Sequence, residues 1–302
     1  MEVTLLDGTV AELDRYDNAA LDGLHWEQER GYAQRIRQSQ RGSQERARAF
    51  AEGYNTVTKI LTHRKGATGG LVMGMSPRFP RLVLKLLRRQ RACGVANPKL
   101  FEIGYGCGAV LDVAARAGFE VTGIEVSSHM REQALEALDA AQHDRLYLGD
   151  YLTHDLGGIA GQVNVMYWND VFEHLPPDES LDYLRKTFDL LSPGGVLLTI
   201  TPNWHVRPSD ITDLVRPKRS EPEGFHLKEY TLGEMISLLS QAGFVRVSTP
   251  LVVTHEHTIL CGRGLAGLKS AAEPLLEWLP FSIAKLLCRG LALSCTLAYK
   301  LR

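Results

Sequence analysis

Short apolar segments alternate with amphipathic segments through the middle of the chain. From Lys99 onward, five apolar segments have the length of buried strands, and most are followed by a segment with helical spacing. The predicted strands cover residues 99–104, 119–126, 145–149, 163–169 and 195–202, and the predicted helices cover 108–117, 128–142 and 178–191. Such alternation predicts an α/β fold in which helices cover both faces of a parallel sheet.

The segment after the fifth strand departs from this alternation. A loop rich in proline and charge spans 203–228, and a helix with a capping box at its start is predicted over 231–242. Two further apolar segments, 244–252 and 255–262, lie too close together for a helical crossover. We therefore expect an antiparallel hairpin at the end of the sheet.

The two ends of the chain are predicted to be helical and to flank this central domain. Residues 1–96 have helical spacing without a nucleotide-binding motif, and residues 263–302 carry a broad apolar surface broken by Lys285 and Arg289. A helix that lies in a membrane interface has this pattern, but so does a helical hairpin packed on the domain or on a second subunit of a homodimer. The central, ligand-binding domain would then cover 97–262.

Composition limits the classes of protein that fit. The 302-residue chain is 44% hydrophobic and 23% charged, which is enough apolar material for a large core. Its five cysteines show no C-x-x-C spacing, so a disulfide framework and a cysteine zinc site are both disfavoured. We expect a reducing, cytoplasmic setting.

The net charge of −1 hides an uneven distribution of charge. Residues 1–29 are acidic, whereas residues 30–91 are strongly basic. The basic region is either a solvated helical surface or a site of attraction for an anionic membrane surface, a phosphorylated substrate or RNA.

The first predicted strand of the central domain runs into a glycine-rich turn. Within residues 100–108, Gly104, Gly106 and Gly108 directly precede a helix. Glycine permits the positive φ of a tight turn and lets a ligand approach the backbone, and the helix N-terminus offers free N–H groups. The turn alone also satisfies the dinucleotide-binding pattern, with Ala109 in the last position.

Acidic residues near this turn favour S-adenosylmethionine over a nicotinamide cofactor. Glu102 lies inside the first strand, where a dinucleotide fold prefers an apolar residue and where the ammonium group of S-adenosylmethionine would find a carboxylate. Glu125 ends the second strand, where an acid can accept both ribose hydroxyls of either cofactor. Asp150 follows the third strand, where it can accept from an adenine amino group.

Taken together, these segments resemble the class I S-adenosylmethionine-dependent methyltransferases, and in particular the ubiquinone-pathway O-methyltransferases. The resemblance covers residues 97–262 and rests on Glu102-x-Gly-x-Gly-x-Gly108, Glu125, Gly149-Asp150, Asn169-Asp170-Val171-Phe172-Glu173-His174-Leu175 and Pro193-Gly194-Gly195. It implies a Rossmann-like seven-stranded sheet with an antiparallel last strand, and an enzyme that transfers a methyl group from S-adenosylmethionine.

The resemblance also implies a role for each matching residue. By position, Glu102 and Gly104 would face the methionine end of the cofactor, with Gly106 and Gly108 in the same loop. Glu125 would bind the ribose and Asp150 the adenine. Asn169 would approach the sulfonium.

We expect O-methylation of a small-molecule or lipid-linked metabolite, with His174 as the base that removes the proton of the acceptor. His174 follows the fourth strand at the edge where acceptors enter such folds, although it could instead only cap the loop. Trp204, His205 and His226 lie in the insertion after the fifth strand and are candidates for the acceptor pocket, with Trp204 and Phe225 as its apolar walls. A surface loop without that role is the alternative.

A divalent metal is a further alternative for the same segment. Asp170, Glu173, His174 and His226 are similar to the carboxylate–histidine metal site of small-RNA 2′-O-methyltransferases. Oxygen and imidazole ligands would suit Mg²⁺ or Mn²⁺. However, Asp170 stands where the RNA enzymes have glutamate, so we expect no metal and keep these four residues as the candidates.

Three functions remain open on the sequence. The first is a metabolite O-methyltransferase held peripherally at a membrane by the basic region and the tail. The second is an RNA methyltransferase, against which we note that residues 30–91 contain few aromatic side chains to stack on bases. The third is a non-catalytic module that binds S-adenosylmethionine.

Overall fold

A seven-stranded sheet forms the centre of the molecule in the computed structural model, which describes residues 1–68, 78–252, 258–260 and 263–301. The strand order is β5-β4-β3-β6-β7-β11-β8. The strands are β3 (Lys99–Ile103), β4 (Glu120–Glu125), β5 (Leu146–Leu148), β6 (Val163–Asn169), β7 (Leu191–Ile200), β8 (Arg246–Ser248) and β11 (Cys295–Tyr299). The strands from β3 to β7 pair in parallel, whereas β11 is antiparallel to both β7 and β8. The predicted α/β fold is confirmed.

The antiparallel strand of the sheet comes from an unexpected part of the chain. We predicted that a hairpin of 244–252 and 255–262 would finish the sheet. In the structure, β9 (Pro250–Val252) and β10 (Thr258–Leu260) do pair antiparallel, but they form a separate two-stranded sheet, and residues 253–257 and 261–262 lie outside the described residues.

The first predicted hairpin strand is borne out in part, because β8 lies within 244–252 and forms the edge of the main sheet, whereas β11 takes the place of the second predicted strand. The residues of β11 lie in the segment that we assigned to a helical tail, so that part of the prediction is wrong. The strand is short and lies between β7 and β8, with residues 295–298 all buried. A short apolar run that is buried on both faces has no alternating pattern that would distinguish it from a buried helix.

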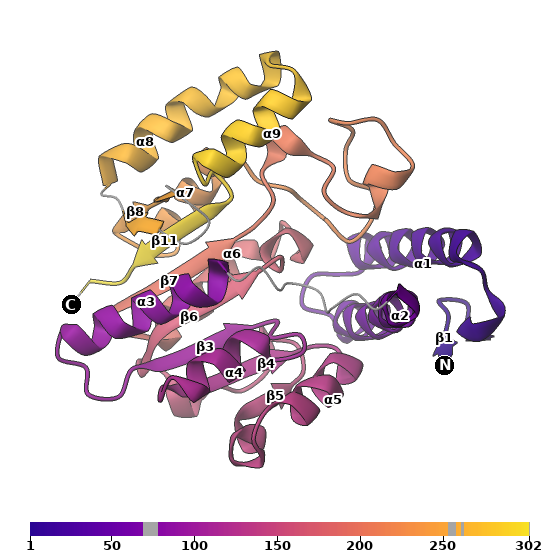
Figure 1. Ribbon diagram of the computed structural model, residues 1–302, viewed down its shortest axis with the longest axis horizontal. Helices are drawn as coiled ribbons and strands as arrows, with labels where there is room; N and C mark the ends of the chain where they lie inside the picture. The colour runs from indigo at the N-terminus through magenta and orange to yellow at the C-terminus, as the bar shows by residue number, and fades with distance from the viewer. Residues whose placement is uncertain (69–77, 253–257, 261–262, 302) are drawn as a thin grey trace.

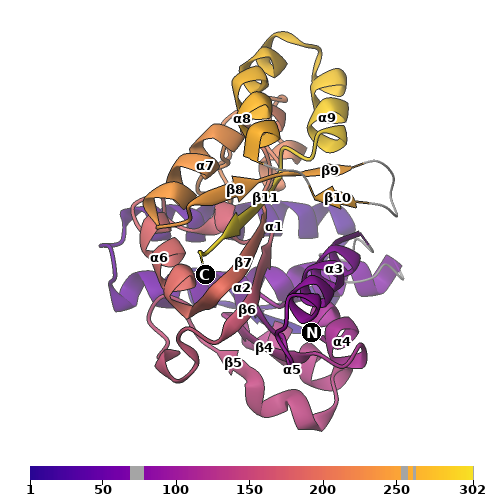
Figure 2. The same cartoon turned by 90° about the vertical axis from the view of Figure 1, so that its left-hand side faces the viewer.

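Helices cover both faces of the sheet. One layer consists of α3 (Arg78–Ala92), α4 (Ala109–Arg116) and α5 (Ser128–Ala137), and the other contains α6 (Ser180–Leu190) and α7 (Leu232–Gln241) (Figure 2). Alternate strand residues point to opposite layers: Leu100 belongs to the core under α3 and α4, and Phe101 belongs to the core under α6 and α7.

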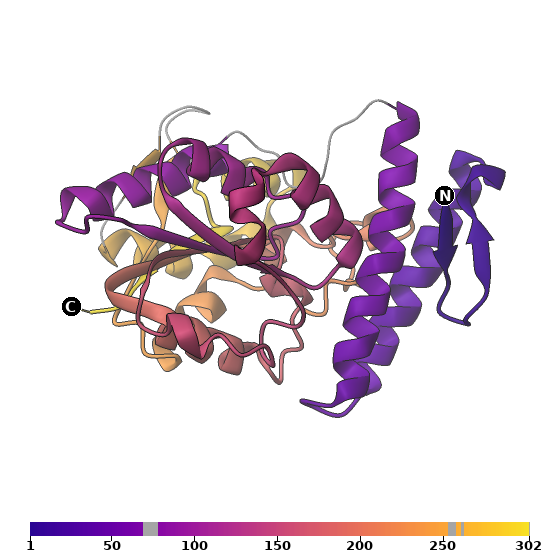
Figure 3. The same cartoon turned by 90° about the horizontal axis from the view of Figure 1, so that it is seen from below.

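Two long helices cross the end of the sheet at which the parallel strands finish (Figures 1 and 3). They are α1 (Asn18–Gln38) and α2 (Gln44–Thr68), and a hairpin of β1 (Glu2–Thr4) and β2 (Val10–Glu12) packs beyond them. The buried guanidinium of Arg46 joins α2 to the start of α6, with Nη1 at 3.0 Å from Asp178 Oδ1 and 2.9 Å from Glu179 Oε1. The helical character of the N-terminal region is confirmed, and the small hairpin was not predicted.

Several basic side chains of residues 30–91 pair with acids of the same chain. Arg30 contacts Glu223, Arg35 contacts Glu45 and Glu52, Arg41 contacts Asp182, and Arg64 contacts Asp22. These ion pairs neutralise charge locally. They favour a structural role for the basic residues of α1 and α2 over attraction of an anionic partner.

The last two helices lie beyond the β8 edge of the sheet (Figures 1 and 2). They are α8 (Arg263–Ala272) and α9 (Phe281–Gly290), joined by a 3-10 turn over Glu273–Trp278. Buried Lys269 anchors α8, because its Nζ donates to Thr249 Oγ1 at 2.8 Å and to the carbonyl oxygen of Pro250 at 3.1 Å. Within the described residues, no helix combines the length and the apolar character needed to cross a bilayer.

Candidate active site

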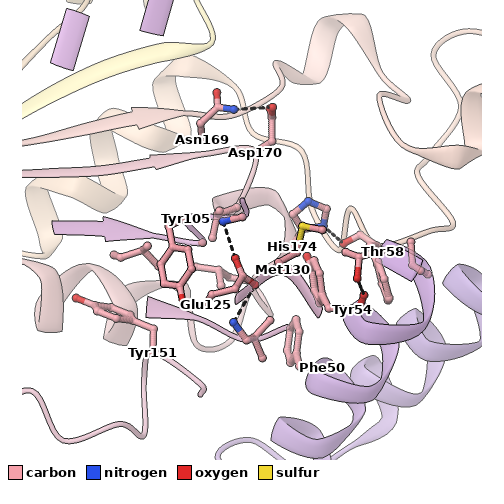
Figure 4. Close-up of a pocket in the computed structure, with 18 of the residues that line it drawn as sticks. Phe50, Tyr54, Thr58, Tyr105, Glu125, Met130, Tyr151, Asn169, Asp170 and His174 are labelled. Atoms are coloured by element: carbon pink, nitrogen blue, oxygen red, sulfur yellow. Dashed lines mark hydrogen bonds between the residues drawn. The ribbon is translucent and has the colours of Figure 1, made fainter. Parts of the chain in front are cut away.

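A cavity of about 600 Å³ lies at the end of the sheet where β3, β4 and β6 finish (Figure 4). This is the edge at which parallel α/β sheets bind their ligands. The predicted site residues that line it are Glu102, Gly104, Gly106, Glu125, Asp150, Asn169, Asp170, His174 and His226. The fold therefore brings together residues that lie up to 124 positions apart in the sequence, from Glu102 to His226.

The glycine turn leaves free space on the cavity side. Gly104, Gly106 and Gly108 all have positive φ, at 68°, 54° and 76°. A Cβ at Gly106 would meet no atom within 4 Å, so a ligand can approach the backbone there. A Cβ at Gly108 would clash with Leu138, so Gly108 is needed for the packing of α4 against the end of α5.

Glu125 connects the end of β4 to the glycine turn. Its Oε2 accepts from the N–H of Gly106 at 2.9 Å, and its Oε1 accepts from the N–H groups of Val126 and Ser127 at 2.9 and 3.0 Å. Burial raises the pKa of Glu125, while these hydrogen bonds oppose the rise. Because each carboxylate oxygen can accept more than one hydrogen bond, ribose hydroxyls can still bind to it.

Two buried polar atoms at this end of the cavity have no hydrogen-bond partner. They are Oε2 of Glu102 and Oδ1 of Asn169. Burial raises the pKa of Glu102 well above its ordinary value, and the nearby charge of Glu125 adds to the effect. An unpaired buried acceptor is costly. A ligand that carries an ammonium group would supply the missing donors, so the residues present fit the methionine end of S-adenosylmethionine.

Asp150 is fixed at the wall of the cavity by two hydrogen bonds. Its Oδ1 accepts from the N–H of Thr153 at 2.9 Å, and its Oδ2 accepts from the hydroxyl of Tyr183 at 3.0 Å. Figure 4 shows Tyr151 on one side of Glu125 and His174 with Tyr54 on the other side, next to α2. Tyr151 therefore lies across Glu125 from His174, and the assignment of the neighbouring Asp150 to adenine stays a prediction.

Glu173 lies between two histidines at the α2 side of the cavity. The Nε2 atoms of His174 and His226 are each 3.9 Å from Oε1 of Glu173, which has no hydrogen-bond partner. The Nδ1 atom of His174 lies 3.0 Å from the carbonyl oxygen of Phe225, and Nδ1 of His226 lies 2.7 Å from Oε1 of Glu229. Both rings are therefore held at Nδ1 and turn Nε2 toward the same carboxylate oxygen.

Burial and mutual charge shift the pKa values of these three groups in different directions. Burial, with the charge of Asp170, raises the pKa of Glu173 to about 8. Burial, with the charge of His226, lowers the pKa of His174 to about 3. For His226, burial alone would lower the pKa, but the hydrogen bond to Glu229 and the surrounding carboxylates raise it to about 9. His174 is thus neutral at pH 7, but it is a weaker base than one with a pKa near the working pH.

The same three residues could hold a divalent metal ion. One ligand atom from each of Glu173, His174 and His226 lies within 4.8 Å of the others. Two imidazoles and one carboxylate suit a transition metal, and the contacts of both Nδ1 atoms are those that orient histidine ligands in metal sites. Asp170 is not part of this group; it has a positive φ of 51°, and its Oδ2 accepts from Nδ2 of Asn169 at 2.8 Å.

Helices α1 and α2 contribute to the cavity, which was not predicted from the sequence. The side chains of α2 that line it are Phe50, Tyr54, Val57, Thr58 and Leu61. Tyr54 stacks on Phe225, with ring centroids 4.9 Å apart and planes at 10°, and meets the ring of His174 edge-on at 5.6 Å. From α1, Oε1 of Glu29 accepts from the N–H of Phe225 at 2.9 Å. The helical spacing of the α2 residues within a basic region was a signal that could have indicated this wall.

Two predicted acceptor residues do not line the cavity. The guanidinium carbon of Arg207 lies 3.8 Å from the ring centroid of Trp204, and Nδ1 of His205 lies 2.8 Å from Oε2 of Glu277. The contact of His205, together with the ion pair between Arg207 and Glu277 at 3.1 Å, joins the loop to the segment that precedes α9. The expectation that Trp204 and His205 contact the acceptor is therefore wrong, whereas His226 from the same loop does line the cavity.

The strand order with one antiparallel strand, together with a cavity over the glycine turn, defines a class I S-adenosylmethionine-dependent methyltransferase. The chain belongs to the family of methyltransferase domains, whose sequence model matches residues 75–249. S-adenosylmethionine is the cofactor of this class, as predicted.

Curated relatives of this chain are ubiquinone biosynthesis O-methyltransferases. The protein of Psychrobacter arcticus is 30% identical over 112 residues, which cover 36% of this chain and 43% of the relative. The protein of Escherichia coli O127:H6 is 30% identical over 116 residues, which cover 38% and 47%. The chain thus spans less than half the length of these two relatives.

A solved structure with the same fold is that of Haemonchus contortus phosphoethanolamine N-methyltransferase 2, in complex with phosphomonomethylethanolamine and S-adenosylhomocysteine. The TM-score is 0.51 at 15% identity, and the match covers 84% of this chain and 60% of that chain. At this identity the likeness concerns the fold.

Proposed function

We propose that this protein methylates a hydroxyl group of an uncharged small-molecule or lipid-linked acceptor. The observation that carries the proposal is the lining of the cavity. Phe50, Tyr54 and Phe225 supply aromatic surface, and no Lys or Arg is present among the described residues that line the cavity. A flat, uncharged acceptor would stack on these rings.

The same lining argues against an RNA or phosphorylated acceptor. Phosphate groups are bound by Lys, Arg or free backbone N–H groups, yet the charged side chains on the acceptor side of the cavity include Glu29, Asp170 and Asp210. These carboxylates outnumber His226, a cation in the same lining because its pKa is raised to about 9, so the lining as a whole would repel a phosphate. The curated relatives are named O-methyltransferases, which supports oxygen as the atom that receives the methyl group.

The residues of the chain would orient the two ligands and exclude water. S-adenosylmethionine supplies a methyl group that its sulfonium activates for in-line displacement. Glu125 holds the glycine turn in its ligand-binding shape, and α1 and α2 cover the open edge of the sheet, which limits access of water. We place the acceptor between Tyr54 and Asn169, with its hydroxyl toward Nε2 of His174, which would accept the proton.

A second candidate for activating the hydroxyl is a divalent metal held by Glu173, His174 and His226. It is favoured by the unpaired Oε1 of Glu173, toward which both Nε2 atoms turn. It is also favoured by the pKa of His174, which at about 3 is low for an unaided base. A metal at this position would lower the pKa of a bound hydroxyl.

The proposed function is tested with methyl-labelled S-adenosylmethionine and a fractionated cell extract. We expect labelled product that partitions into organic solvent and resists mild alkali, as an ether does. The Glu125→Ala variant serves as the control and should give no labelled product. Label that remains with RNA or with phosphorylated aqueous metabolites would contradict the proposal.

Chelation separates the two candidates for proton removal. The purified enzyme is treated with EDTA, passed over a desalting column and assayed with and without Mg²⁺ or Mn²⁺. If His174 alone is the base, turnover is unchanged by chelation, and His174→Ala lowers kcat by about 100-fold or more with little change in cofactor affinity. If a metal is required, chelation abolishes turnover and the added ion restores it. Normal turnover in His174→Ala would exclude both candidates.

A further inference from the structure

The helical pair at the β8 edge carries a concentration of exposed apolar side chains. They are Leu268, Leu275, Trp278, Ile283, Leu286, Leu287 and Leu291, which we call the α8–α9 surface. Trp278 is 88% exposed, and Leu268 and Leu286 are each 70% exposed. On α9, Ala284 and Cys288 are buried, and the rest of the helix faces outward. Apolar patches of this kind on a soluble domain mark an interaction site.

The charges of the α8–α9 surface are of one sign. Lys285 and Arg289 are exposed on α9, and residues 278–302 contain no acid. Of the two acids of the preceding turn, Glu273 is buried and accepts from the N–H of Leu232 at 2.8 Å. Glu277 is 37% exposed, but its charge is paired with Arg207 at 3.1 Å. An exposed tryptophan, leucines and cations without acids match the composition of helices that lie in an anionic membrane interface.

The loop that forms one wall of the cavity is attached to this surface. In the 3-10 turn Ile211–Leu214, Ile211 lines the cavity, whereas Leu214 is 61% exposed. The guanidinium of Arg219, in the same loop, donates to the carbonyl oxygens of Leu276 at 2.9 Å and Leu279 at 2.7 Å. Any partner that binds the α8–α9 surface would therefore lie next to the loop that forms this wall of the cavity.

We propose that the α8–α9 surface, together with Leu214, docks on the surface of an anionic lipid bilayer. The apolar side chains would enter the headgroup region while Lys285 and Arg289 face lipid phosphates. A second copy of the chain fits this surface less well. A two-fold contact apposes the same patch of both copies, so Lys285 and Arg289 would meet a surface in which α9 offers no acid to pair with them.

Vesicle co-sedimentation tests the docking directly. The full-length protein is mixed with phosphatidylcholine vesicles and with vesicles that contain 30% phosphatidylserine, at low and high salt. We expect binding to the anionic vesicles that is about tenfold tighter than to neutral ones at low salt, with this preference lost at high salt. Equal binding to both vesicle types, or no binding to either, would overturn the proposal.

Matched surface variants locate the contact. The double variants Trp278→Glu/Leu286→Glu and Lys285→Glu/Arg289→Glu should each lose at least about tenfold in affinity for anionic vesicles. Val10→Glu is the control, because Val10 is 61% exposed on the N-terminal hairpin; it should bind as the wild type does. All variants should keep the wild-type Tm and S-adenosylhomocysteine affinity, since every changed side chain is exposed.

Two further outcomes separate this proposal from its alternatives. If light scattering shows a dimer that Trp278→Glu/Leu286→Glu converts to a monomer, and vesicles do not bind, the surface is an interface between copies and the proposal fails. Vesicle binding is measured without acceptor, so failure of the proposed acceptor class would leave it intact.

Discussion

At the scale of single residues, the site contains buried acids whose side-chain oxygens lack hydrogen-bond partners within the chain. Glu102 is the clearest case, because it is buried in β3, its Oε2 has no partner and burial raises its pKa well above the ordinary value. Glu125, by contrast, has both oxygens occupied by backbone N–H groups. Glu102 is arranged for a ligand at the expense of stability, whereas Glu125 maintains the shape of the turn and keeps lone pairs for ribose hydroxyls.

The Glu102→Gln variant should be more stable than the wild type, and increasingly so at higher pH. The folded-state pKa of Glu102 is raised above its unfolded value of about 4.5, so its contribution to stability is full below that pH and is lost as pH rises toward the folded pKa. We expect equal stability near pH 5 and a gain of about 1–3 kcal/mol at pH 8 from urea unfolding.

The same substitution should weaken cofactor binding by about tenfold or more, because the ammonium of the cofactor loses a carboxylate. Titration calorimetry with S-adenosylhomocysteine measures this. Glu136→Gln is the matched control, since Glu136 is exposed on α5. Its stability in urea and its affinity for S-adenosylhomocysteine should both stay at wild-type values. A Glu102→Gln variant that binds normally would show that the carboxylate does not face the ligand.

At the scale of elements, α2 has two functions. It supplies the apolar wall of the acceptor site, and through Arg46 it is fixed to the start of α6. Tyr54 connects the apolar wall to the candidate base, because its ring contacts both Phe225 and His174. We therefore expect α2 to determine which acceptor is used.

Tyr54→Ala should raise KM for the acceptor by about tenfold while leaving the affinity for S-adenosylhomocysteine within about twofold, because stacking of a ring is worth roughly 1 kcal/mol beyond its buried area. Tyr54→Phe should restore most of the loss, since the ring is retained. Steady-state kinetics and calorimetry on the two variants distinguish these effects. Equal loss of cofactor and acceptor affinity in Tyr54→Ala would indicate a general structural role instead.

Sequence reasoning was most successful for elements whose signals are local. The strands from β3 to β7 and the glycine turn are marked by short apolar runs, by glycines and by helix-forming segments that follow them. Phe225 was predicted as an apolar wall of the acceptor pocket and does line the cavity. Its stacking on Tyr54 could not be found this way, because the two residues are far apart in the chain and meet only through tertiary packing. Trp204 and His205 were misassigned for the related reason that a loop sequence does not show which way each side chain turns.

At the scale of the whole molecule, the C-terminal segment divides into a core part and a surface part. β11 lies inside the main sheet, and Leu297 is 0% exposed between β7 and β8. The helices α8 and α9 instead present apolar residues outward. The contrast predicts that truncating a leucine in β11 lowers the stability of the protein strongly, whereas truncating a leucine on α9 hardly changes it.

Leu297→Ala should destabilise the protein by about 2–5 kcal/mol, because it removes a fully buried side chain from the centre of the core. Leu286→Ala, the matched control on α9, should change stability by less than about 0.5 kcal/mol. Thermal or urea unfolding of both variants measures the difference. Equal effects of the two substitutions would contradict the placement of β11 in the sheet.

The central claim is that one cavity places the cofactor over the glycine turn, where Glu125 would bind its ribose. Calorimetric titration of Glu125→Ala with S-adenosylhomocysteine tests it most directly, with Glu136→Ala as the control. We predict that the Kd of Glu125→Ala rises by about 100-fold, because the variant loses hydrogen bonds to a charged acceptor, while the control binds as the wild type does. An unchanged Kd in Glu125→Ala would contradict this account of the site.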